Sequence, residues 1–152
     1  METCNHERIP AALERSRSGN GAHVWIFFDN FVPAAKARKL GTFLMTRTLD
    51  RRPEIGLDSF DRFFPNQDTL PKGGFGNLIA LPLQKAAREK NHSVFLDDNM
   101  NPCADQWAFL ASLTRTDESK LDMILLKQKM RQSRGRKSLL SCPPLLSHFL
   151  KR

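Results

Sequence analysis

Blocks of apolar and polar residues along this chain predict a mixed fold of strands and helices. Residues 24–28 form an uninterrupted apolar run rich in β-forming residues, and a polar, glycine-containing stretch at 16–21 precedes it. We predict that 9–16 and 24–28 are antiparallel strands joined by this stretch. Because 24–28 is apolar on both faces, we expect it to be a central strand, covered by helices on at least one side.

Further along the chain, the spacing of apolar residues changes to that of a helix. Residues 34–49 carry Ala, Leu, Phe and Met at helical spacing, and Pro53 follows their end. Residues 55–64 mix acids with large apolar residues in a strand-like pattern, and 65–76 form a long loop rich in Gly and Pro. The remaining predicted elements are strands at 77–83 and 93–96 and helices at 102–113 and 118–131.

The length and composition of the chain indicate one domain with additional terminal segments. Its 152 residues suffice for a single core, and a hydrophobic content of 40% argues against compositional disorder. Clear periodicity is lost after Gly135. The predicted segments are a frayed N-terminus at 1–8, a domain at 9–115, a basic helix at 116–132 and a disordered tail at 133–152.

The cysteines and the hydropathy of the chain indicate the cellular compartment in which we expect the protein. Cys4, Cys103 and Cys142 lie far apart, with no metal-ligand spacing, which favours reduced thiols over a disulfide framework. No apolar run reaches the length of a membrane span, and the N-terminus lacks the pattern of a signal peptide. We therefore expect a cytoplasmic protein without a membrane span.

The net charge of +8 is concentrated near the C-terminus. Residues 1–114 carry 14 Lys and Arg against 13 Asp and Glu, whereas residues 115–152 carry 10 against 3. A basic segment of this kind attracts phosphate backbones. It is equally typical of a solvated helix face followed by a loose end, and the sequence leaves both interpretations open.

The turn before the apolar run has the residues of an anion-binding loop. Gly19 permits a positive φ and a tight turn that exposes backbone N–H groups. Ser16 and Ser18 add hydroxyl groups, and His23 stands at the root of the strand that follows. An ordinary polar hairpin turn followed by a core strand explains the same residues, so the turn alone does not decide between them.

Metal-assisted phosphoryl transfer requires several carboxylates converging on one or two cations. Asp58 and Asp61 are candidates, because acids in an apolar, strand-like stretch are hard to explain by solvation. Asp97 and Asp98 are typical of a turn. Lys72, among three glycines, is a candidate phosphate contact. The chain has no Walker motif, no Gly-x-Ser-x-Gly motif and no zinc-ligand spacing.

Two long strings of the sequence resemble conserved blocks of the archaeo-eukaryotic primase superfamily, in particular the primase-like domain of the TOTE conflict systems. Residues 10–28 (Pro-Ala-Ala-Leu-Glu-Arg-Ser-Arg-Ser-Gly-Asn-Gly-Ala-His-Val-Trp-Ile-Phe-Phe) resemble the second block, and residues 56–84 resemble the third. Residues 93–98 and 105–110 continue the resemblance, which covers about 9–115.

The resemblance implies an α+β fold, a partial RRM-like primase catalytic core in which an antiparallel sheet packs with helices. It implies nucleotidyl transfer with Mg²⁺ or Mn²⁺, acting on nucleoside triphosphates and nucleic acid in association with helicase and nuclease modules. Ser18 and His23 match the Ser and His that contact the incoming triphosphate, within a nucleotide-binding loop that includes Ser16 and Gly19. Asp61, or less closely Asp58, matches a metal-binding aspartate, and Lys72 lies near a phosphate contact.

The sequence departs from the family at the first block, an Asp-x-Asp that supplies two of the three metal-binding acids. Only Met1 to Arg8 precede the second block, and they contain no such motif. One carboxylate cannot hold two Mg²⁺ ions. We therefore expect a truncated primase domain, inactive alone. The alternatives are a non-enzymatic nucleotide or nucleic-acid-binding remnant, using the loop, the basic segment and aromatics on the sheet, or a product without function.

Overall fold

The structure is a computed structural model that describes residues 1–69, 72–74, 76 and 78–140. These residues form five α-helices, one 3₁₀ helix and three strands, which confirms the predicted α+β class. In chain order the elements are α1 (Glu2–His6), β1 (Ala12–Arg15), β2 (Ala22–Trp25), α2 (Ala34–Arg51), η1 (Leu57–Ser59), α3 (Lys85–Arg88), β3 (Phe95–Leu96), α4 (Gln106–Ser112) and α5 (Glu118–Leu140).

The three strands form an antiparallel sheet in the order β2-β1-β3, so β1 is the central strand. The predicted hairpin is confirmed, with Glu14 paired to His23 on one side and to Phe95 on the other. The prediction of a central strand at 24–28 was wrong. β2 lies at the edge and Val24 is 50% exposed, because β3 pairs with the opposite side of β1.

The sheet separates two apolar clusters, and residues in and after β2 alternate between them. Ile26 and Phe28 pack toward the cluster of α1, α2 and α5, whereas Trp25 and Phe27 pack toward the cluster on the α4 side. This is the alternation that extended backbone imposes on successive side chains. The buried members of the first cluster are Cys4, Ile9, Leu40, Phe43, Leu44, Leu121 and Leu125, and those of the second are Ala12, Leu83 and Phe95.

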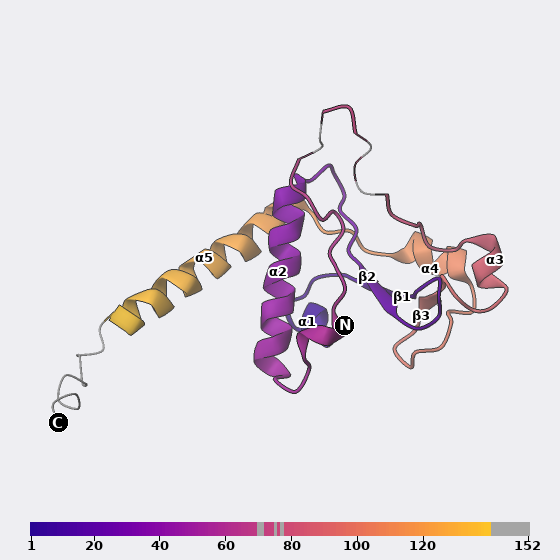
Figure 1. The fold of residues 1–152 in the computed structure, drawn as a ribbon, viewed down its shortest axis with the longest axis horizontal. Helices are drawn as coiled ribbons and strands as arrows, with labels where there is room; N and C mark the ends of the chain where they lie inside the picture. Colours follow the sequence, from indigo (N-terminus) through magenta and orange to yellow (C-terminus); the bar gives the residue numbers. More distant parts are fainter. Residues whose placement is uncertain (70–71, 75, 77, 141–152) are drawn as a thin grey trace, which may run out of the picture.

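The predicted strand at 55–64 was wrong. That segment contains η1 and then irregular chain that runs alongside α2 (Figure 1). The ring of Phe63 attaches this segment to α2, and just after it Asp68 forms an ion pair with Arg38 of α2 at 2.7 Å. A Cβ atom at Gly41, in the middle of α2, would lie 2.8 Å from that ring. Close packing of Phe63 therefore accounts for a glycine inside a helix.

Two other segments differ from the sequence-based expectation. Residues 2–6, expected to be frayed, form α1, because Thr3 and Cys4 are buried and the hydroxyl of Thr48 in α2 contacts that of Thr3 at 2.8 Å. The strand predicted at 77–83 is absent from residues 78–83, of which Leu78, Ile79 and Leu81 are exposed. Pro82 has no backbone N–H group to donate to a neighbouring strand, which is consistent with the absence of a strand at 78–83.

The predicted helices at 34–49 and 118–131 are confirmed as α2 and α5. Lys36 joins the two, with its Nζ atom 2.6 Å from Glu118 and 2.8 Å from Asp122. The hydrogen bonds that Lys36 donates to these two carboxylates, first Asp122 and then Glu118, raise the pKa of Lys36. Beyond this contact α5 projects away from the rest of the molecule (Figure 1).

α5 continues to Leu140, so the predicted tail is helical over 133–140; its remainder, 141–152, lies outside the described residues. None of the helices in the described part of the chain has the length and apolarity needed to cross a membrane.

Candidate functional site

The β1–β2 turn is closed by its own serine residues. The Ser16 hydroxyl lies 3.0 Å from that of Ser18 and accepts a hydrogen bond from the Gly21 N–H at 3.1 Å. The carbonyl of Ser16 accepts from the Gly19 N–H at 2.9 Å. Ser16 and Ser18 thus lie together, but several N–H groups of the turn donate within it. Arg17 and Ser18 are exposed in this conformation, whereas Ser16 is half-buried.

Gly19 has a φ of +83° and packs directly against His92. A Cβ atom at Gly19 would lie 2.4 Å from Nε2 of that ring, and the Nδ1 atom of His92 lies 3.2 Å from the carbonyl of Arg17. No local sequence pattern identifies this role of His92, since the contact joins residues more than seventy positions apart. His92 therefore supports the turn from outside the hairpin.

We expect the Gly19→Ala variant to lose about 1–2 kcal/mol of stability, because alanine is strained at positive φ and its Cβ would displace the His92 ring. Denaturant unfolding measures this loss. Gly73→Ala is the matched control, since Gly73 also has positive φ (+72°) but has nothing near its Cβ position. Equal losses of stability in Gly19→Ala and Gly73→Ala would contradict the role assigned to His92.

Beside the turn, Glu14 is a carboxylate that is only 2% exposed and accepts three hydrogen bonds. Its Oε2 atom lies 2.6 Å from Nε1 of Trp25 and 3.1 Å from Nδ1 of His23, and its Oε1 atom accepts from the Ser93 hydroxyl at 2.9 Å. The side chain of His23 is itself 50% exposed. The imidazole is therefore held on one edge by a buried acid while much of the ring is open to solvent.

No local sequence pattern identifies Glu14. Register explains its position, because alternation along β1 places it on the same face as Ala12, and cross-strand pairing places His23 and Trp25 there as well. The sequence does contain a signal for Glu14 once the strand register is known. A charged residue at an inward-facing position of β1 is followed by two side chains with ring N–H groups, His23 and Trp25, at inward-facing positions of β2.

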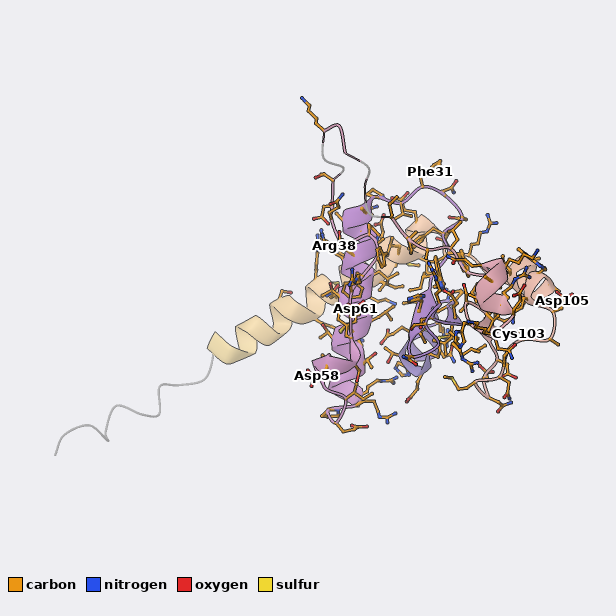
Figure 2. All side chains as sticks on the ribbon, turned by 45° about the vertical axis from the view of Figure 1, so that its right-hand side comes forward. Phe31, Arg38, Asp58, Asp61, Cys103 and Asp105 are labelled. Atoms are coloured by element: carbon orange, nitrogen blue, oxygen red, sulfur yellow. The ribbon has the colours of Figure 1, made fainter. Side chains whose placement is uncertain are left out.

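The predicted metal-binding acids lie elsewhere. Asp58 is an exposed residue of η1, and Asp61 is 80% exposed and pairs with Arg62 at 3.0 Å. Figure 2 shows both beside α2, whereas His23 is on the face of the sheet that packs toward α4. Across the residues that the structure describes, no three His, Cys, Asp or Glu side chains gather as a metal site. The donor set in the described chain therefore does not fit a two-metal centre.

Lys72 is also separate from the hairpin. It is exposed and belongs to segment 72–74, which lies above the end of α2 in Figure 1, away from β1 and β2. Ser16, Ser18, Gly19 and His23 thus lie in one hairpin, whereas Asp58 and Asp61 lie beside α2.

Comparison with known families matches residues 1–124 to the family described as "TOTE conflict system, Archaeo-Eukaryotic Primase domain". The chain belongs to this family. The matched region includes the whole hairpin and extends beyond the expected 9–115 at both ends. No curated protein matches the chain.

Other residues that resemble family blocks have structural roles in this primase-family chain. Asp105 caps α4 by accepting from the N–H groups of Trp107 and Ala108 at 3.0 and 2.9 Å. The side chain of Gln106 bonds both the N–H and the carbonyl of Phe95, at 2.7 and 2.9 Å, and so holds β3. Asp97 accepts from two backbone N–H groups of its own turn, as expected of a turn former.

The two described cysteines are not activated nucleophiles. Burial raises the pKa of the Cys4 thiol, and burial together with the charge of Asp97 raises the pKa of the Cys103 thiol. A nucleophilic cysteine requires the opposite shift, toward the thiolate. The exposed imidazole of His23 thus remains the best candidate group on this face of the sheet.

Proposed function

We propose that the chain binds the triphosphate of a nucleoside triphosphate at the β1–β2 hairpin, as the nucleotide-binding part of a primase-type domain. The observation that carries this proposal is the half-exposed imidazole of His23, held by a buried carboxylate in the hairpin whose turn contains the Ser16–Ser18 pair. Hydroxyl and imidazole N–H donors are well suited to phosphate oxygens. Arg17 adds an exposed positive charge to the same turn.

The reaction of primase-type enzymes is nucleotidyl transfer assisted by divalent cations. Asp61, the acid that resembles the family's metal ligand, lies on the α2 side of the sheet and pairs with Arg62. We therefore propose that the chain binds nucleotide without itself completing nucleotidyl transfer.

The experiment is a calorimetric titration of the purified chain with a nucleoside triphosphate, the diphosphate and the unphosphorylated nucleoside, with and without Mg²⁺ or Mn²⁺. We expect affinity to increase with the number of phosphates and to change little with the metal. A folded chain that binds the nucleoside as tightly as the triphosphate, or binds neither, would contradict the proposal.

The Asp61→Asn variant is expected to bind the triphosphate within about twofold of the unmodified chain, because an exposed surface pair contributes little. The same titration with Mg²⁺ measures this effect. An Asp58→Asn variant is the matched control in the same segment. A large loss of affinity that requires the metal, and that occurs in Asp61→Asn but not in Asp58→Asn, would show that Asp61 reaches the bound nucleotide.

The projecting part of α5 favours a second function, non-enzymatic binding of nucleic acid. Its exposed side chains include Lys127, Lys129 and Arg131. Replacing all three by Gln is expected to weaken binding to single-stranded DNA and to reduce the dependence of its affinity on salt, because fewer counterions are released.

Fluorescence anisotropy at several salt concentrations measures this effect. A variant with Gln at three exposed lysines elsewhere removes the same charge and is the matched control; these lysines are Lys39, Lys85 and Lys90. Equal salt dependence in the two triple variants would exclude a specific role for α5.

A further inference from the structure

The donors and acceptors around Glu14 restrict where the protons lie. An ionised carboxylate can only accept, and the indole Nε1 of Trp25 can only donate. Oε2 accepts from Trp25 at 2.6 Å and also meets Nδ1 of His23 at 3.1 Å. The second contact is a hydrogen bond only if Nδ1 carries a proton. The neutral ring is then the Nδ1–H tautomer, and Nε2 is the nitrogen left for other partners.

We propose that Glu14 is a positioning residue, which holds His23 by Nδ1 and leaves Nε2 as the group that meets an anionic ligand at the hairpin. This inference rests on the proposed function for the nature of the ligand, a phosphate oxygen of a nucleoside triphosphate. Donation from Nε2 to such an oxygen requires a second proton, so the bound ring is an imidazolium between two anions. The charge of Glu14 stabilises that cation.

Packing alone does not explain why a carboxylate occupies the position of Glu14. Glu14 lies at a buried position beside the apolar residues Ala12 and Phe95, where an apolar side chain would avoid the cost of burying a carboxylate. Trp25 and Ser93 are two of its partners, but its third partner, His23, presents half of its side chain to solvent. A histidine that served only as a partner for Glu14 would not need half of its side chain to be exposed to solvent.

The first test measures the tautomer of His23 directly in the ligand-free chain. Long-range ¹H–¹⁵N correlation spectra distinguish a protonated from an unprotonated ring nitrogen, and a His23→Gln variant assigns the signal among the four histidines. At a pH where the ring is neutral, we expect Nδ1 to be protonated and Nε2 unprotonated. Observation of the Nε2–H tautomer as the main form would overturn the proposal, and this result requires no variant of Glu14 to fold.

The second test separates the geometry of Glu14 from its charge. In Glu14→Gln, the amide oxygen can still accept from Trp25 and His23, while the amide N–H₂ donates to the Ser93 hydroxyl, which can reverse its role. We expect this variant to keep the Nδ1–H tautomer but to bind triphosphate about tenfold more weakly, because the imidazolium loses its charged partner. In Glu14→Met, with no acceptor, we expect the tautomer to change as well.

Ser93→Ala is the matched control, because it removes a hydrogen bond to the other oxygen of Glu14 and leaves the contact with His23. It is expected to lower stability but to keep both the tautomer and the affinity. Unchanged affinity in Glu14→Gln, or an equal loss in Ser93→Ala, would overturn the proposal. If the tautomer is as expected but the unmodified chain binds no triphosphate, the proposed function fails and the positioning of His23 by Glu14 stands.

Discussion

The His23→Ala variant is expected to bind a nucleoside triphosphate about 10- to 100-fold more weakly than the unmodified chain, the usual effect of removing a hydrogen-bond donor to a charged group. Its stability should fall by about 1–3 kcal/mol, because the buried Glu14 carboxylate loses one of its three hydrogen-bond partners. Calorimetric titration measures the affinity, and denaturant unfolding measures the stability.

His6→Ala is the matched control. His6 is exposed in the last turn of α1, in a different element from the hairpin, so its removal takes away a second imidazole without touching the site. We expect its affinity to equal that of the unmodified chain. Similar losses of affinity in the two histidine variants would mean that general electrostatic attraction, rather than the hairpin, binds the triphosphate.

The Phe95→Ala variant is expected to lose about 3–5 kcal/mol of stability, the range for truncating a fully buried aromatic side chain. Phe95 is 0% exposed, and its ring centroid lies 5.4 Å from that of Phe109 in α4. β3 is only two residues long, and this packing holds it together with its pairing to β1 and its two hydrogen bonds with Gln106. Thermal and denaturant unfolding measure the effect.

Phe31→Ala is the matched control, since Phe31 is fully exposed and its side chain points away from the body of the molecule (Figure 2). We expect its stability to remain within about 0.5 kcal/mol of the unmodified chain. Phe95→Leu keeps most of the apolar volume and should retain a fold if Phe95→Ala does not. A Phe95→Ala variant as stable as Phe31→Ala would contradict the position given to β3.

Local patterns predicted the elements whose stability depends on nearby residues. α2 and the beginning of α5 follow from helical spacing of apolar residues, and the hairpin follows from a glycine-containing turn before a β-forming run. The edge position of β2 could not be predicted in this way. It depends on β3 pairing with β1 across about eighty residues of sequence, which no local pattern reports.

The segment around Asp58 and Asp61 shows a second limit. Acids between large apolar residues were interpreted as a strand carrying metal ligands, yet the apolar residues instead anchor an irregular segment along α2, and the acids face solvent. Alternating acids and aromatics therefore fit a chain lying on a helix as well as they fit a strand. The position of Phe63 against Gly41 of α2 shows that this segment lies on a helix and is not a strand of the sheet.

Four residues of the candidate site can be predicted from the sequence. Ser16, Ser18, Gly19 and His23 are close in sequence and have the chemistry of phosphate ligands, and their role stays a prediction. Glu14 was not found, because an acid nine residues before a histidine has no special meaning until strand register places them opposite each other. The residues that orient a functional group are thus harder to predict than the group itself.

The central claim is that the hairpin is where this chain meets a triphosphate. The measurement that tests it most directly is a map of ¹H–¹⁵N chemical-shift changes over the whole chain during titration with a nucleoside triphosphate. We predict the largest changes at residues 14–23 and at His92, with little change in η1 or along α5. The largest changes along α5, or at Asp58 and Asp61, would contradict the claim.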